Sequence, residues 1–144
     1  MTDTAVAHMV GDTLVATVRI EASPAIVFPY FTDAELMAQW IGEHADLDAQ
    51  PGGTFALRFD ASNAVRGTYL VVDPPHRVMF TWGRPDDPEL PEGSTTVEVL
   101  LTADGDDTVV ELFHRDLPAA QVDRHIEGWT LFVGGLPTVV RTPA

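Results

Sequence analysis

The amino-acid sequence predicts an α+β domain in which an antiparallel sheet curves around a long C-terminal helix. Residues 67–82 (GTYLVVDPPHRVMFTW) form two β-type runs on either side of the breaker Asp73-Pro74-Pro75-His76. A period of two in the apolar residues dominates residues 44–115, and a period of about 3.6 follows residue 118. Strands that follow one another and end in a helix favour an antiparallel sheet with the helix packed on one face.

The first elements are a strand and a short helix. Residues 14–22 (LVATVRIEA) alternate apolar and polar side chains, which predicts a strand with one buried face. Ser23 is a suitable N-cap, and Pro24 suits the first position of a helix that we expect to reach residue 31. Pro29 keeps that helix short or kinked.

A second short helix is predicted over residues 34–41 (AELMAQWI), beginning after Thr32 or Asp33. Four large apolar residues of this segment share one helical face at spacings of three and four: Leu36, Met37, Trp40 and Ile41.

Six further strands are expected between residues 44 and 116. They cover residues 44–49, 54–60, the two halves of 67–82, 95–103 and 108–116, with turns at 51–53, near 62–63 and at 104–107. The polar, proline-rich segment 84–93 (RPDDPELPEG) is predicted to be a solvated acidic loop that could gate a cavity.

The last element is a long helix after Leu117-Pro118. Its apolar stripe consists of Val122, His125 or Ile126, Trp129, Phe132 or Val133, Leu136 and Val140. Weak helix formers interrupt it at Gly128, Gly134, Gly135 and Pro137, so packing must hold it. The alternative interpretation is that the small residues leave room beside the helix.

Length and composition indicate one domain over residues 1–144, because 144 residues with 45% hydrophobic content suffice for one buried core. The chain has no cysteine, which excludes disulfides and thiolate chemistry. The first residues lack a basic segment followed by an apolar one, and no run of about 18 apolar residues occurs. We therefore expect a cytoplasmic protein.

The charge argues against two classes of partner. The formal net charge is −14, and all eight basic residues are arginines. A basic surface that binds phosphate groups would have to form within the negative potential of the whole protein. Neither nucleic acid nor an anionic membrane is therefore an expected partner.

Several short motifs occur in a characteristic order along nearly the whole chain. They are Ser23-Pro24, Trp40, Pro51-Gly52-Gly53, residues 67–82, His114 with Leu117-Pro118, and Gly128-Trp129. In this order the sequence resembles the START-like (SRPBCC) superfamily, and within it the single-domain bacterial type of the activator of heat-shock protein 90 ATPase homologue family. The resemblance implies a helix-grip fold, in which a seven-stranded antiparallel sheet wraps a C-terminal helix and two short helices follow the first strand.

The same resemblance implies a cavity between sheet and helix, which in relatives accommodates largely apolar molecules such as lipids, hormones or polyketides. Activation of the chaperone belongs to eukaryotic members that carry an additional N-terminal domain, so the family name implies no activity here.

Strand and helix periodicity selects the side chains that face such a cavity. The candidates for ligand contact are Trp40, Phe55, Leu57, Phe59, Phe80, Trp82, Leu112, His114, His125, Trp129 and Phe132. The alternative for each of them is a purely structural place in the core.

His114 and His125 are the polar residues of this set, and they are weak candidates for a proton-transfer role. The sequence lacks the common nucleophile and phosphate-loop motifs and contains no lysine, so an enzyme is the less expected class. The histidines show no regular metal-ligand spacing, and neither a metal nor a cofactor is expected.

Three functions remain open at this point. The first is the binding of a small apolar molecule, and the second is a cavity enzyme of the cyclase, dehydratase or hydrolase type that uses a histidine. The third is an interaction module for a chaperone or another protein, for which no ligand is needed.

Overall fold

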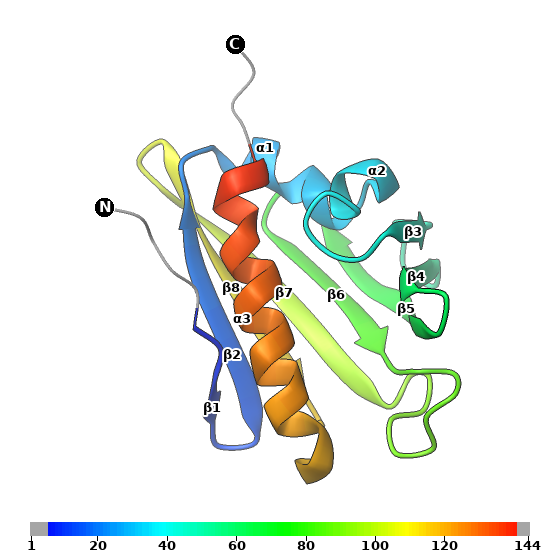
Figure 1. The fold of residues 1–144 in the computed structure, drawn as a ribbon. Coiled ribbons are helices and arrows are strands. Elements are labelled where there is room, and N and C mark those ends of the chain that lie inside the picture. Colours follow the sequence, from blue (N-terminus) through cyan, green and yellow to red (C-terminus); the bar gives the residue numbers. More distant parts are fainter. Residues whose placement is uncertain (1–5, 141–144) are drawn as a thin grey trace.

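The computed structural model describes residues 6–140 of the chain, so residues 1–5 and 141–144 of the predicted domain lie outside the described residues. It contains an eight-stranded antiparallel sheet with the order β1-β2-β8-β7-β6-β5-β4-β3 (Figure 1). The strands are β1 (His8–Val10), β2 (Thr13–Ile20), β3 (His44–Leu47), β4 (Thr54–Asp60), β5 (Asn63–Asp73), β6 (Arg77–Trp82), β7 (Thr95–Asp104) and β8 (Asp107–Arg115). The helix-grip class predicted from the sequence is confirmed.

The long helix α3 (Val122–Val139) lies across one face of the sheet, nearest to β2 (Figure 1). A three-residue 3₁₀ turn, η2 (Ala119–Gln121), precedes it. Its buried residues Trp129, Val133 and Leu136 follow the predicted stripe and join the buried side chains of the strands in one hydrophobic cluster. Packing against the sheet thus holds a helix that its glycines weaken.

The sheet has one strand more than the seven expected. β1 pairs with β2 through His8↔Val15 and Val10↔Thr13, and a two-residue turn joins the two strands. Gly11 adopts φ = 60° in that turn, a conformation that glycine takes at little cost. The sequence feature that indicates this hairpin is the Gly11-Asp12 pair between two short apolar runs.

The strand β5 begins at Asn63, four positions before the expected start at Gly67. Gly67 is an interior residue of the strand, where a Cβ atom would lie 1.8 Å from the carbonyl oxygen of Thr81. The glycine therefore permits a close approach of two backbones within the sheet.

The two short helices follow β2 as expected, with α1 (Pro24–Val27) continuing into the 3₁₀ turn η1 (Phe28–Phe31). Ser23 occupies the N-cap position, although its side chain makes no capping hydrogen bond. The change to 3₁₀ geometry coincides with Pro29.

The helix expected over residues 34–41 is shorter in the structure, where α2 covers only Ala34–Met37. Asp33 is its N-cap and accepts a hydrogen bond from the backbone N–H of Leu36 at 3.1 Å. After Met37 the chain continues in tight turns with i→i−3 hydrogen bonds, and Gly42 follows at φ = 76°. The spacing of the apolar residues predicted the buried face correctly. The predicted length of the helix was wrong.

A buried hydrogen bond ties the short helices to the sheet. The hydroxyl of Tyr69 in β5 donates to the carbonyl oxygen of Phe31 at 2.8 Å, and burial raises the pKa of this hydroxyl well above its ordinary value. Trp40 donates from Nε1 to the carbonyl oxygen of Tyr30 at 2.9 Å. These bonds fix the end of the domain opposite the first turn of α3.

We expect Tyr69→Phe to lower the free energy of unfolding by about 1–2 kcal/mol, because the Phe31 carbonyl would lose its buried donor. Chemical denaturation measures the change. An unchanged midpoint and slope would contradict the assignment of this hydrogen bond as a structural tie.

In the described part of the chain, no helix is both long and apolar enough to cross a membrane.

Candidate functional site

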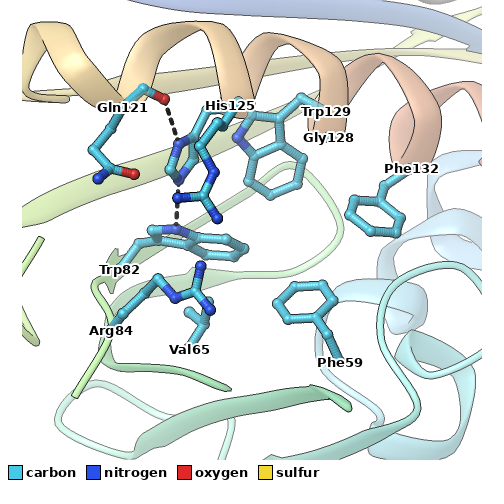
Figure 2. A pocket seen from close by; sticks show the side chains of 10 residues that line it. Phe59, Val65, Trp82, Arg84, Gln121, His125, Gly128, Trp129 and Phe132 are labelled. Atoms are coloured by element: carbon cyan, nitrogen blue, oxygen red, sulfur yellow. Dashed lines mark hydrogen bonds between the residues drawn. The ribbon is translucent and has the colours of Figure 1, made fainter. Parts of the chain in front are cut away.

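A pocket of about 160 Å³ opens between the first half of α3 and the strands β4 to β6 (Figure 2). Its lining residues come from three strands or their ends, from the loop after β6 and from one helical face: Phe59, Val65, Trp82, Arg84, Gln121, Arg124, His125, Gly128, Trp129 and Phe132. The members from α3 recur at spacings of three and four, which places them on one helical face, and Gln121 at the N-cap position continues that spacing.

Aromatic rings form the walls of the pocket. The rings of Trp82 and Trp129 pack at a centroid distance of 5.0 Å, and those of Phe59 and Phe132 at 5.6 Å (Figure 2). An irregularity in the β4–β5 register between Arg58 and Asp60 accompanies the half-buried position of Phe59 at the rim. The walls therefore offer ring faces and edges to an apolar molecule.

His125 lies in the middle of the lining and is neutral. Its Nδ1–H donates to the backbone carbonyl of Gln121 at 2.7 Å, and its Nε2 accepts from Trp82 Nε1 at 3.3 Å (Figure 2). Desolvation lowers the pKa of His125, and the nearby charges of Arg124 and Arg84 lower it further, against the opposite effect of the Gln121 carbonyl. Protonation would also place two N–H donors against each other at Trp82.

His114 in β8 lies behind the pocket wall and connects three elements. Its Nδ1 accepts from Trp129 Nε1 at 3.0 Å, and its Nε2 lies 2.8 Å from Thr95 Oγ1. The Thr95 hydroxyl already donates to the carbonyl oxygen of Trp82 at 2.6 Å, so His114 must donate from Nε2. These partners assign the neutral Nε2–H tautomer, and burial, followed by the proximity of His125, lowers the pKa of His114 well below 6.5.

Two arginines and one glutamine make the polar end of the pocket. Arg84 donates from Nη2 to Asn63 Oδ1, while Arg124 projects from α3. Gln121 is 4% exposed, and its Nε2 donates to Asp87 at 3.3 Å and to Glu89 at 3.4 Å. Its Oε1 is buried and has no hydrogen-bond partner.

A sequence model of the family described as activator of Hsp90 ATPase homolog 1-like protein matches residues 21–141. The chain belongs to this family. The comparison with curated proteins found no match.

Solved structures of the same fold come from diverse sources. An HSP90 activator from Plasmodium falciparum, PFC0360w, is 24% identical with a TM-score of 0.76, and the match covers 92% of this chain and 99% of that one. The protein MLL2253 from Mesorhizobium loti is 21% identical with a TM-score of 0.80 over 92% and 99% of the two chains. DynU16, a protein in the dynemicin biosynthetic locus, is 23% identical with a TM-score of 0.77, and the match covers 90% of this chain but only 47% of that one. At these identities the likeness shows the helix-grip fold alone.

In this member of the Hsp90 ATPase activator homologue family, five of the residues selected from the sequence line the pocket together. They are Phe59, Trp82, His125, Trp129 and Phe132. His114 contacts two of them from behind, with ring centroids 5.6 Å from Trp82 and 6.0 Å from Trp129.

The other selected residues lie outside this lining. Phe55 and Phe80 stack on each other with centroids 3.9 Å apart, and Leu57 and Leu112 are each buried in the core. Trp40 packs edge-on against Phe31 beside the short helices. Strand parity identified inward-facing side chains but could not separate the pocket wall from the packed core.

Apart from His125, the polar lining residues Arg84, Gln121 and Arg124 were not predicted from the sequence. Arg84 continues the alternation of Val78, Phe80 and Trp82 by two more positions, so parity could have pointed to it. Gln121 and Arg124 precede His125 and Gly128 by four residues each, which puts them on the same helical face. The predicted lining consisted of large apolar or aromatic side chains and histidines, so these three residues were not among the candidates.

Among residues 6–140, no group of three or more histidine, aspartate or glutamate side chains has a geometry that could hold a metal ion.

Proposed function

We propose that this protein binds a small, largely apolar molecule in the pocket beside α3. The observation that carries the proposal is a space of about 160 Å³ whose walls include Phe59, Trp82, Trp129 and Phe132. A preformed concave site with apolar walls and a few polar groups is the usual form of a small-molecule site. Cavities of about 150 Å³ accept one benzene-sized molecule.

The expected affinity is modest. One aromatic ring buries on the order of 150–250 Å², which at about 25 cal/mol per Å² corresponds to roughly 4–6 kcal/mol before the cost of association. Without that cost, roughly 4–6 kcal/mol corresponds to dissociation constants from about 1 mM to about 40 μM, and the cost weakens the affinity further, so binding experiments need ligand at millimolar concentrations.

Binding is favoured over catalysis by the state of the two histidines. Both ring nitrogens of His114 and of His125 are engaged by protein groups, so neither offers a free nitrogen to a ligand. A cavity enzyme of this family would need one of these hydrogen bonds to break before proton transfer.

Gly128 offers a direct test. A Cβ atom at this position would meet only Phe132 Cε2, at 3.8 Å, so further atoms of a leucine side chain can extend into the pocket that Gly128 lines. We expect Gly128→Leu to weaken the binding of a neutral probe, methyl 3-phenylpropanoate, by at least tenfold in calorimetric or tryptophan-fluorescence titration.

Gly135→Leu is the matched control, because it replaces a glycine of the same helix that does not line the pocket and where a Cβ atom has no neighbour within 4 Å. Both substitutions improve helix propensity by up to about 1 kcal/mol, so stability does not distinguish them. Equal binding by the two variants, or probe binding that survives Gly128→Leu, would refute the pocket as the binding site. Native mass spectrometry of the purified protein, followed by denaturation, would identify a molecule that it carries.

A further inference from the structure

The polar end of the pocket carries positive charge in a strongly acidic protein. The chain has a net charge of −14 and only eight arginines, yet Arg84 and Arg124 both line this pocket. Among residues 6–140, neither of them has a carboxylate oxygen within the 4.0 Å of an ion pair. Each guanidinium has five N–H donors, of which Asn63 receives one from Arg84.

Arg84 is held in place by a relay of side chains. Asp60 Oδ2 accepts from Asn63 Nδ2 at 2.7 Å, and Asn63 Oδ1 accepts from Arg84. A carboxylate can only accept and a guanidinium can only donate, so both ends fix the orientation of the Asn63 amide. Hydrogen bonds from Asn63 and then from Ser62 lower the pKa of Asp60 to about 2, which keeps the anchor ionised.

Both arginine charges act at the centre of the pocket. Desolvation is the main cause of the lowered pKa of His125, and the charges of Arg124 and Arg84 lower it further. His125 lies between Trp82 and Gln121 in the lining (Figure 2). A potential that disfavours an imidazolium disfavours any cationic ligand at this place and favours an anionic one.

Gln121 indicates that the ligand carries a hydrogen-bond donor. Its Nε2 must face Asp87 and Glu89, which only accept, so its Oε1 is the atom without a partner. Figure 2 shows this amide oxygen turned toward the other lining residues and the nitrogen turned away. A buried acceptor without a donor is costly, and a ligand hydroxyl or N–H group would satisfy it.

We propose that the ligand has an apolar, single-ring body and carries a carboxylate with a hydroxyl or N–H group next to it. The ring would lie among Trp129, Phe59 and Phe132, the carboxylate against Arg84 and Arg124, and the donor at Gln121 Oε1. This inference rests on the proposed function, because it assigns the chemistry of the same pocket.

A second, polar hollow shares Arg84 and Arg124 with the pocket and is lined beyond them by Asp86 and Asp87. These carboxylates do not line the apolar pocket. The carboxylates of Asp86 and Asp87 repel an anion that enters the polar hollow. The ligand carboxylate is therefore expected at the two arginines, where the pocket and the hollow meet.

Three probes with one ring and one chain length separate the contributions. Methyl 3-phenylpropanoate is neutral, 3-phenylpropanoate adds the carboxylate, and 3-phenyllactate adds a hydroxyl beside it. At low ionic strength we expect the acid to bind at least tenfold more tightly than the ester, and the hydroxy acid several-fold more tightly than the acid. The cation 3-phenylpropylammonium should bind more weakly than the ester.

Two arginine variants test the anion site against the general field of the protein. Arg84→Gln and Arg124→Gln should each weaken 3-phenylpropanoate about tenfold and leave the ester within twofold. Arg66→Gln is the matched control, since it removes the same charge from an exposed arginine of β5 that does not line the pocket. It should change the affinity of neither probe by more than twofold.

Gln121→Met tests the donor requirement, because methionine has a similar length without the amide oxygen. The preference for 3-phenyllactate over 3-phenylpropanoate should disappear in this variant, while the acid retains its advantage over the ester. Thermal melts of all variants check that the fold is intact.

The outcomes separate this inference from the function on which it rests. If the ester and the acid bind equally and Gly128→Leu abolishes both, the apolar site stands and the anion assignment is wrong. If Arg66→Gln weakens the acid as much as Arg84→Gln does, the anion preference comes from the overall field and the assignment is also wrong. If none of the probes binds, both proposals fail.

Discussion

We expect His114→Ala to lower the free energy of unfolding by about 3–5 kcal/mol. His114 is 0% exposed, so the truncation leaves a cavity in the core. It also removes the acceptor of Trp129 Nε1 and the donor to Thr95 Oγ1, and each buried group left unpaired costs about 1–3 kcal/mol. Partial collapse around the site reduces the sum to the stated range. Urea denaturation followed by circular dichroism measures it.

His114→Gln is the informative companion, because a glutamine amide can accept from Trp129 and donate to Thr95 with a different reach. It should recover part of the loss. His44→Ala, at an exposed position of β3, should stay within about 0.5 kcal/mol of the wild type. A loss below about 1 kcal/mol for His114→Ala would show that water replaces the imidazole and that the chain of hydrogen bonds does not support the pocket wall.

The hydrogen bonds of the two histidines explain how the pocket keeps an apolar lining. Trp82 and Trp129 each carry an indole N–H, and each donates it to a histidine nitrogen. The indole N–H groups of the aromatic walls are therefore satisfied within the protein, and the ring surfaces remain for a ligand. These bonds connect β6 and β8 with α3, and Thr95 adds β7 through its hydrogen bonds with Trp82 and His114, so the wall is part of the core.

The sequence predicted the fold well because its signals are local and periodic. Alternation in residues 14–22, 54–60 and 108–116 identified strands, and the stripe through Trp129 and Leu136 identified the helix. The errors arose where a tertiary contact decides the local structure. The short length of α2 depends on tight turns after Met37, and the interior position of Gly67 depends on the backbone of β6, neither of which a periodicity reveals.

The pocket was harder to predict than the fold because its lining depends on which of several equivalent side chains has space beside it. Phe80 and Trp82 share a strand face, yet Phe80 stacks on Phe55 and Trp82 faces the pocket. Gly128 supplies part of the difference: the glycines of the helix indicated room beside it, but not which strand residues would face that room. The polar end was not predicted because arginine and glutamine usually lie on the protein surface, so their presence in a sequence does not indicate a pocket.

Stability should also fall steeply as the pH drops below about 6.5. Burial lowers the pKa of both His114 and His125 in the folded protein, while each returns to its ordinary value near 6.5 on unfolding. Between the folded and unfolded values the unfolded chain binds more protons, so the free energy of unfolding is full above pH 6.5 and decreases as the pH falls. Between its unfolded and folded pKa values each histidine adds at most about 1.4 kcal/mol per pH unit, and this window is wider for His114, whose pKa is lowered further than that of His125.

Carboxylates act in the same direction at lower pH and must be kept apart from the histidines. Desolvation raises the pKa of Glu98, but hydrogen bonds and charges from Arg77 and Arg115 outweigh it, so its pKa lies below 4.5 and its effect begins only near that pH. Denaturation curves between pH 5.0 and 7.5 therefore isolate the histidines.

The slope of the unfolding free energy against pH in this window gives the number of protons that the histidines take up on unfolding. Two protons would give at most about 2.7 kcal/mol per pH unit, and His114→Gln should remove the larger part of the observed slope, because the pKa of His114 is lowered more strongly than that of His125. The contribution of His125 should grow when the arginine charges are less screened, because Arg84 and Arg124 lower its pKa through space. A wild-type slope that His114→Gln leaves unchanged would mean that His114 is protonated in the folded protein. Trp129 Nε1 would then face an N–H group, and the hydrogen bonds assigned to the pocket wall would be wrong.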